Sequence, residues 1–411
     1  MKCEYFTFTM ILLLTLSGCG TSNISSISPQ DSASDPGASV VEGSASSEAA
    51  PQSVPEPKAA MPAKISRTVS GVTVSVDPMI EMLSVIQYLS DYDEEFGLLT
   101  KHKTSYHDDL ETAFREFEAH EAVTFFNEVM TQGFAFDCPP TACLYLDEHF
   151  SILPEFEGSD YQRNRLRHTA MGDKMENFRD VMEQFYIDTN FGDFFESHHD
   201  FYSRMIDTYS ENFPQWNMTQ AMETYYGKEM AGYNIILVAL FHPGGFGPTL
   251  EFADGMHVYS IQGPYLAEND TPLFGDSDAI ANLVIHEFGH SFVPVNEQDN
   301  AAMVAEVQRS EYLMEAVEED MSRNAYGSWA SAYEELVLRA AVINIMKANT
   351  TIDPETLLQY ERDTGFIYID IVYEVVQLYS KNREEYPVFD DFVPFITDAL
   401  LDAYPDNGAA A

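Results

Sequence analysis

Basic residues are scarce in this 411-residue chain, which has 21 lysines and arginines against 67 aspartates and glutamates. The formal net charge at pH 7 is therefore −46. A protein this acidic repels nucleic-acid phosphates and anionic lipid head groups, so we expect no nucleic acid as a partner. A solvated acidic surface is the commonest meaning of such a charge, which also favours cationic over anionic peptides as substrates.

Cysteine is also rare, with four in the chain. Cys3 and Cys19 lie near the N-terminus, and Cys138 and Cys143 flank residues 139–142. In an exported protein the second pair could close a small disulfide loop; two reduced, buried thiols are the alternative. A zinc knuckle is not expected, because the sequence has no two further ligands at matching spacing.

Long hydrophobic runs are absent, since no later segment reaches the ~18 apolar residues that a membrane-spanning helix needs. A shorter apolar run at 10–16 follows Lys2 and ends in Ser17, Gly18 and Cys19. Residues 1–18 therefore read as a signal peptide, and their ending resembles that of bacterial lipoprotein signals. The resemblance implies a lipid on the Cys19 thiol and a location in the bacterial cell envelope, at the outer membrane or cell surface. An ordinary secretory signal with an unrelated cysteine is the alternative.

Residues 19–64 contain few large apolar side chains and many serines, alanines and prolines. Such a composition is typical of a disordered tether, which would hold the folded part away from the membrane. We predict one folded domain at 65–405, with a mainly helical N-terminal part at 65–227 and a catalytic part at 228–405.

Periodicity predicts an α+β fold that is predominantly helical. Alternating or continuous apolar residues predict strands at 68–76, 233–240 and 257–261, with a turn-rich loop at 242–248. Helical spacing predicts helices from residue 78, at 113–129 with His120 as a cap or core residue, and through the aromatic segment 175–210. Further helices are expected at 300–323, 329–346, 368–378 and 389–401, the last kinked or broken at Pro394. The result is a small mixed sheet before residue 276 and a helical lobe after residue 290.

Residues 286–290 read His-Glu-Phe-Gly-His, an instance of H-E-x-x-H. Residues four apart share one face of a helix, so His286 and His290 can bind one metal ion. Glu287 lies beside them, where it can accept a proton from a metal-bound water. The helix is supported by possible capping residues at 276–278 and by Pro294 beyond its end. Zn²⁺ is the metal we expect; a chance match on a buried helix is the alternative.

A catalytic zinc usually has three protein ligands, and Asn296 stands where a third histidine would follow. A carboxylate from a later helix is therefore expected. The glutamates considered are Glu311, Glu315, Glu318, Glu319, Glu334 and Glu335. We favour Glu335 over its neighbour Glu334, because it lies in an apolar helix with Arg339 one turn further on, where the guanidinium could orient or neutralise it.

These residues carry a resemblance to a known family. Residues 285–293 (IHEFGHSFV) and 335–340 (ELVLRA) resemble an uncharacterised bacterial domain family of zinc metallopeptidases with an HEF-x-HSF motif and a downstream E-x-L-V-R-A. Weaker similarity at 120–123, 133–137 and 383–394 extends it over most of 68–400. The resemblance implies a zincin-like fold, with His286, His290 and Glu335 on zinc and Arg339 matching the family's arginine. Residues 294–295 depart from the family's Asn-Pro.

We therefore expect zinc-dependent hydrolysis of a peptide or protein substrate, with Glu287 activating the water that attacks the carbonyl. Arg339 is expected to assist, and a second oxyanion donor could be Tyr326, Tyr333 or His242. By analogy with zinc peptidases of this type, residues 256–263 should form the edge strand that pairs with the substrate. Two alternatives remain open, namely a non-catalytic acidic surface lipoprotein with structural zinc and a zinc amidase acting on cell-wall peptides.

Overall fold

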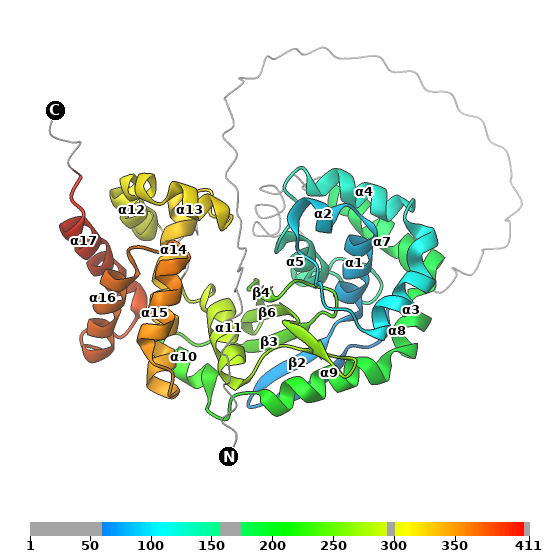
Figure 1. The fold of residues 1–411 in the computed structure, drawn as a ribbon, viewed down its shortest axis with the longest axis horizontal. Coiled ribbons are helices and arrows are strands. Elements are labelled where there is room, and N and C mark those ends of the chain that lie inside the picture. Colours follow the sequence, from blue (N-terminus) through cyan, green and yellow to red (C-terminus); the bar gives the residue numbers. More distant parts are fainter. Residues whose placement is uncertain (1–59, 157–173, 294–300, 407–411) are drawn as a thin grey trace, which may run out of the picture.

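We describe the chain from a computed structural model, which places residues 60–156, 174–293 and 301–406. The predicted fold class is confirmed as α+β, predominantly helical, with a small mixed sheet whose strands all precede the helix that carries the HEFGH motif. Figure 1 shows this sheet between two groups of helices, one cyan to green and one yellow to red. The predicted signal peptide, Cys19 and the tether up to residue 59 lie outside the described residues.

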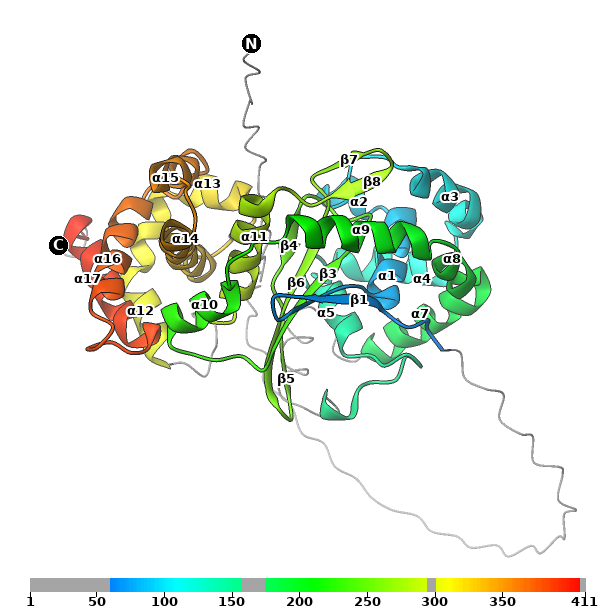
Figure 2. The same cartoon turned by 90° about the horizontal axis from the view of Figure 1, so that it is seen from below.

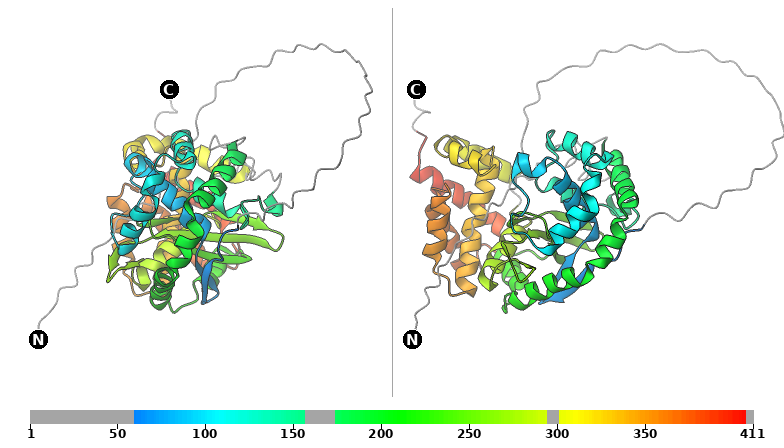
Figure 3. Two further views of the ribbon diagram at one scale, coloured as in Figure 1. Left: turned by 90° about the vertical axis from the view of Figure 1, so that its right-hand side faces the viewer. Right: turned by 45° about the vertical axis from the view of Figure 1, so that its right-hand side comes forward.

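The main sheet has the order β1-β2-β3-β6-β4, and β5 also pairs with β6. Strands β2 and β3 are parallel, as are β3 and β6, while β1, β4 and β5 are added antiparallel. The hairpin of β5 and β6 reaches beyond the helices at one end of the sheet (Figure 3). The strand bounds are β1 Ile65–Val69, β2 Val72–Val76, β3 Gly232–Leu237, β4 Gly244–Phe246, β5 Thr249–Phe252 and β6 Gly255–Gly263.

Two sequence predictions about the sheet need correction. The single strand expected at 68–76 is the hairpin β1–β2, because Ser70 and Gly71 adopt φ of 50° and 85° and turn the chain. Paired positive φ values are typical of tight hairpin turns, and the apolar alternation continues across the turn, which hides it in the sequence. The loop expected at 242–248 contains β4, a strand held by pairing with β6 rather than by its own propensity.

Helices fill the sequence between β2 and β3. The predicted helix at 113–129 is broken by a 3₁₀ turn, Arg115–Phe117, after which His120 caps a new helix by accepting a hydrogen bond from Ala122 N (3.0 Å). The cap role of His120 is thus confirmed. Aromatic residues of the segment 175–210, such as Phe185, form core as predicted. The helices are α1 Pro78–Leu89, α2 Tyr92–Phe96, α3 Ser105–Phe114, α4 Glu121–Met130, α5 Cys138–Leu144, α7 Met175–Thr189, α8 Phe191–Ser197, α9 His199–Asn212 and α10 Met218–Tyr226.

Cys138 and Cys143 both lie in α5, where they are buried and unbridged. The disulfide alternative is therefore wrong for this pair, and the buried-thiol alternative is confirmed. Burial raises the pKa of the Cys143 thiol well above its usual value, so this cysteine is held in its neutral form.

The second helical group is built around α14, Trp329–Asn349, which is buried on nearly every face as its composition predicted. Seen end-on in Figure 2, α14 is surrounded by other helices of this group. The predicted helix at 300–323 is interrupted by a 3₁₀ segment, and Pro394 lies in the first turn of α17 after a break. The elements are α11 Ser277–Gly289, α12 Ala301–Ser310, η4 Glu311–Ala316, α13 Glu318–Arg323, α15 Pro354–Asp363, α16 Ile369–Lys381, η5 Phe389–Phe392 and α17 Val393–Ala403.

The sheet crosses the expected boundary at 227/228, since β2 pairs with β3. Residues on both sides of this boundary therefore belong to one sheet and one core. A separate two-stranded sheet, the hairpin of β7 Leu266–Glu268 and β8 Thr271–Leu273, connects β6 to α11. Asp270 at its tip accepts hydrogen bonds from the Ser105 backbone N–H and hydroxyl, both at 2.6 Å, which ties this hairpin to α3.

Candidate metal centre

Helix α11 carries the HEFGH motif, as predicted. Asp276 caps it by accepting a hydrogen bond from Ala279 N (3.0 Å), and the last helical residue is Gly289. Phe288 packs against Tyr233 of β3 with ring centroids 5.3 Å apart, which anchors the helix on the sheet. A Cβ on Gly289 would collide with Leu338 of α14, so glycine here allows α11 and α14 to approach closely.

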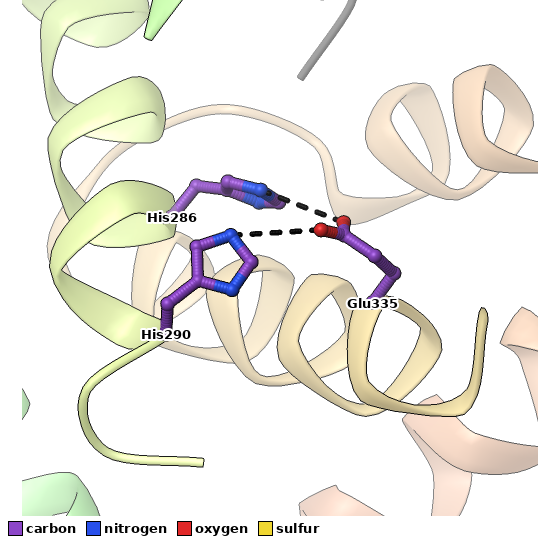
Figure 4. A group of neighbouring side chains, drawn as sticks. All are labelled: His286, His290 and Glu335. Carbon is purple, nitrogen blue, oxygen red and sulfur yellow. Dashed lines mark ion pairs between the residues drawn. The ribbon is translucent and has the colours of Figure 1, made fainter. Parts of the chain in front are cut away.

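The close approach of α11 and α14 brings His286, His290 and Glu335 together (Figure 4). His286 Nε2 lies 3.5 Å from Glu335 Oε2, and His290 Nε2 lies 3.5 Å from Glu335 Oε1. The ligand-type atoms of the three residues all fall within 4.8 Å of one another. Two imidazole nitrogens and one carboxylate in this arrangement match the donor set of a catalytic zinc site.

Several buried polar atoms in this cluster lack hydrogen-bond partners among the residues described, which is consistent with a site for a metal ion. In the described part of the chain, His286 Nε2, Glu335 Oε1 and both carboxylate oxygens of Glu287 are buried without a hydrogen-bond partner. Buried polar atoms in native proteins are nearly always paired, so four such atoms in one place need an explanation. A cation held by His286, His290 and Glu335, with water beside Glu287, would satisfy them, and the residues therefore fit the expected group.

The two candidate glutamates of α14 have different positions. Glu334 Oε1 lies 3.3 Å from His290 Nδ1, the ring nitrogen that faces away from Glu335. A proton on Nδ1 donated to Glu334 leaves His290 Nε2 as a lone pair for a metal. Glu335 therefore belongs to the cluster that could hold a metal, whereas Glu334 contacts the far nitrogen of His290. The other four candidates, Glu311, Glu315, Glu318 and Glu319, are not part of the cluster.

Arg339 lies next to Glu335, as predicted, with Nε donating to Glu335 Oε2 at 3.1 Å. The same guanidinium donates to Glu361 Oε2 of α15 at 2.9 Å and to the Tyr326 hydroxyl at 3.2 Å. Its plane lies over the Phe366 ring, 4.5 Å from the centroid. Arg339 thereby fixes one oxygen of Glu335 and leaves Oε1 for another partner.

Comparison with protein families places this site within a known group. A family model described as "Domain of unknown function (DUF4932)" matches residues 72–399. The chain belongs to this family. No match to a curated protein or to a solved structure was found. The matched range of the DUF4932 domain contains the sheet from β2 onward and every residue of the candidate centre.

Burial and neighbouring charges set the protonation states in the DUF4932 site. Burial lowers the pKa of His286 well below its usual value, with Arg339 adding to the effect. Burial also acts to lower the pKa of His290, but the hydrogen bond that His290 donates to Glu334 and the charge of Glu335 outweigh it and raise that pKa to about 9. For Glu287, burial raises the pKa to about 8, with Glu335 adding to it. A bound cation would oppose the effects on Glu287 and His290.

Glu287 faces the sheet at β4. A Cβ on Gly245 would lie 3.1 Å from Glu287 Cγ and 3.2 Å from Oε1, and a Cβ on Gly247 would collide with the Glu287 backbone oxygen. The prediction that residues 256–263 form an edge strand is wrong, because β6 pairs with β3 on one side and with β4 and β5 on the other. The edge beside the metal helix is β4, which the sequence hid within a glycine-rich segment.

The three candidate oxyanion donors are not equivalent in the structure. The Tyr333 hydroxyl is paired with Thr397 Oγ1 of α17 at 2.8 Å, whereas the Tyr326 hydroxyl accepts a hydrogen bond from Arg339 at 3.2 Å. His242 lies just before β4, with its ring 5.3 Å from that of Phe246. Sequence reasoning missed Tyr265, a buried residue after β6 whose pKa is raised well above its usual value by burial, with Glu287 adding to the shift.

The residues that follow α11 are held in place by contacts that involve the C-terminal segment. Lys228 Nζ donates to Phe292 O at 3.3 Å and to both oxygens of Asp390, at 2.8 and 2.7 Å. Gly227 has φ of 73° and packs against the Pro387 backbone, which leaves no room for a Cβ. Part of the similar stretch at 383–394 therefore has a structural role, to hold the end of the helix that carries both histidines.

Proposed function

We propose that this DUF4932 protein is a zincin-like zinc metallopeptidase. The observation that carries the proposal is the pairing of the His286–His290–Glu335 cluster with Glu287, whose carboxylate is buried, unpartnered and adjacent to it. A structural zinc site needs no such base, so this feature favours hydrolysis over a non-catalytic role. A zinc amidase would use the same residues, and the choice of substrate is the open part of the proposal.

In this scheme His286, His290 and Glu335 would hold the zinc. When bound, zinc supplies a Lewis acid that polarises a carbonyl and makes water more acidic. Glu287 accepts a proton from the attacking water and delivers it to the leaving amine. Glu334 keeps His290 in the tautomer that presents Nε2, and Arg339 holds Glu335 in place. The edge of β4 offers main-chain groups to an extended substrate.

The direct test combines metal content with hydrolysis. Purified protein should contain one zinc per chain and cleave members of a mixed peptide library, and a chelator should abolish both zinc and cleavage. Restoring zinc should restore cleavage. Protein that binds no zinc, or zinc-loaded protein that hydrolyses no peptide or cell-wall amide, would refute the proposal.

We also propose that the domain is anchored by a lipid on Cys19 in the cell envelope. The proposal rests on the signal-like pattern in residues 1–19 alone. In the described ranges, no helix has the length and hydropathy of a membrane span. A fatty-acid analogue should label the wild type in its host, and Cys19→Ala should be unlabelled and move to the soluble fraction. A variant that stays in the membrane fraction would contradict the anchor.

A further inference from the structure

The partner of Arg339 on α15 was not expected from the sequence. Glu361 is buried, with 8% of its surface exposed, and its Oε2 accepts a hydrogen bond from an Arg339 terminal nitrogen at 2.9 Å. Helix α15 starts at Pro354, where Asp353 caps it by accepting from Glu355 N at 3.1 Å. Neither Glu361 nor α15 belongs to the segments that carry the candidate ligands.

Charge balance gives this contact a consequence for the metal centre. Two buried carboxylates, those of Glu335 and Glu361, share the single guanidinium of Arg339, which lies between them. The guanidinium uses Nε for Glu335 and a different nitrogen for Glu361, so it serves both carboxylates at once. Arg339 therefore does not serve Glu335 alone, and Glu335 Oε1, which has no hydrogen bond within the described residues, faces His290. Without Glu361, Arg339 and Glu335 would form a neutral buried ion pair, and the carboxylate of Glu335 would attract a cation less strongly.

We propose that Glu361 is a positioning residue for the metal centre: by sharing Arg339, it keeps the guanidinium from neutralising Glu335 and leaves that carboxylate available to a divalent cation. The inference rests on the metal binding in the proposed function, but not on peptide hydrolysis. Its geometry has two further supports. Tyr326 and Phe366 hold the guanidinium from other directions, so Arg339 is fixed between the two glutamates instead of folding over one of them.

Removing the charge of Glu361 should therefore weaken metal binding without touching a ligand. In Glu361→Gln the guanidinium keeps one carboxylate partner, Glu335, and competes with the cation for it. Partners of metal ligands typically change metal affinity about 10- to 100-fold, and we expect a loss in that range for zinc. Glu361→Asp keeps the charge and should stay within about threefold of the wild type, because charge rather than shape is the cause.

The experiment is a chelator competition that measures zinc affinity in the full chain, with folding checked by circular dichroism of the metal-free protein. The variants are Glu361→Gln, Glu361→Asp and the control Glu355→Gln, the same change at an exposed glutamate of α15. Co²⁺ serves as a second probe, since its visible spectrum should shift in Glu361→Gln as the donor strength of Glu335 falls. Loss in Glu361→Gln alone supports the proposal; wild-type affinity in Glu361→Gln, or an equal loss in Glu361→Asp, overturns it.

A double variant keeps the proposal testable if Glu361→Gln does not fold. Arg339→Met with Glu361→Met removes the charge pair together and leaves neither charge buried alone. Glu335 then has no cationic competitor, so zinc affinity should stay within about tenfold of the wild type; a loss beyond about 100-fold would overturn the proposal. Wild-type protein that binds no zinc would overturn the proposed function as well, whereas zinc binding without hydrolysis would overturn that function alone.

Discussion

The helical group between β2 and β3 and the metal helix each bury one carboxylate completely, and they surround it differently. Glu81 of α1 accepts a hydrogen bond from the Tyr106 hydroxyl at 2.9 Å and another from Ala239 N at 3.3 Å, and Tyr106 is in turn bonded to Tyr202 at 2.9 Å. Among the residues that the structure places, Glu287 of α11 has no hydrogen bond to either oxygen. Burial raises the pKa of both, to about 7 for Glu81 and about 8 for Glu287.

The comparison shows that a shifted pKa by itself does not identify a catalytic carboxylate. Both groups are shifted by the same cause, the loss of water around the charged form. What separates them is the supply of donors, because the core around Glu81 provides partners and the core around Glu287 provides none. An unpaired buried carboxylate is costly and is retained where it has something to bind.

The largest expected effect is on hydrolysis when the unpaired carboxylate is changed. Glu287→Gln removes the base but no ligand, so peptide turnover should fall by about 10²- to 10⁴-fold while zinc content is unchanged. The matched control is Glu81→Gln, the same substitution at the paired carboxylate, which should keep turnover within about threefold. If the Glu287→Gln variant hydrolyses peptides at the wild-type rate, the proposed role of Glu287 as the base is wrong.

The adjacent glutamates of α14 allow the proposed metal ligand, Glu335, to be compared with Glu334, the proposed hydrogen-bond partner of a ligand. Glu335→Gln should lower zinc affinity by roughly 100-fold or more because an anionic ligand is lost, and Glu334→Gln by about tenfold because only the tautomer of His290 is disturbed. His286→Ala and His290→Ala should lose both zinc and activity. Chelator competition measures the zinc affinity of each variant. A larger loss of zinc affinity in Glu334→Gln than in Glu335→Gln would reverse our assignment of the ligand.

Glu81 makes a prediction for stability instead of activity. Its pKa is about 7 in the folded chain against a usual value of 4.5, so the folded state holds this proton more tightly than the unfolded state. The stabilisation from that proton is fully present below pH 4.5 and is lost as pH rises through about 7. Relative to the wild type, Glu81→Gln should therefore gain about 3 kcal/mol of unfolding free energy between pH 4.5 and 8. Denaturant unfolding of both proteins at pH 4.5 and 8 tests this prediction. If the difference in unfolding free energy between Glu81→Gln and the wild type is the same at both pH values, the prediction is wrong.

The smallest expected effect comes from the glycine that packs on Glu287. In Gly245→Ala the new Cβ would press on the Glu287 side chain at 3.1 to 3.2 Å, which should displace the carboxylate and lower kcat about tenfold with little change in thermal stability. Gly327→Ala is the control, because its Cβ would meet no atom within 4 Å. An unchanged kcat, or a loss of activity that only follows a loss of stability, would count against contact between β4 and the base.

Local patterns predicted the parts of this protein that depend on neighbours in the chain. The helix at 277–289, its cap at Asp276 and the shared face of His286 and His290 all follow from spacing within a few turns. The buried nature of α14 followed from its apolar composition. Other elements were missed or misread, namely the turn inside 68–76, strand β4 and helix α15. Strand β4 is held by pairing with β6 and leaves no periodic signal of its own, whereas α15 has a local cap at Asp353 that the sequence prediction missed.

The sequence by itself determined that His286 and His290 would share one helical face with Glu287 beside them, because helix geometry is local and repeats every few residues. Only the tertiary structure decided which of two adjacent glutamates completes the cluster. Glu334 and Glu335 have the same side chain, but α14 packs on α11 so that Glu335 lies near Nε2 of both histidines while Glu334 lies near Nδ1 of His290. The same long-range packing brought Glu361 to Arg339 and β4 to Glu287, contacts that no stretch of the chain encodes alone.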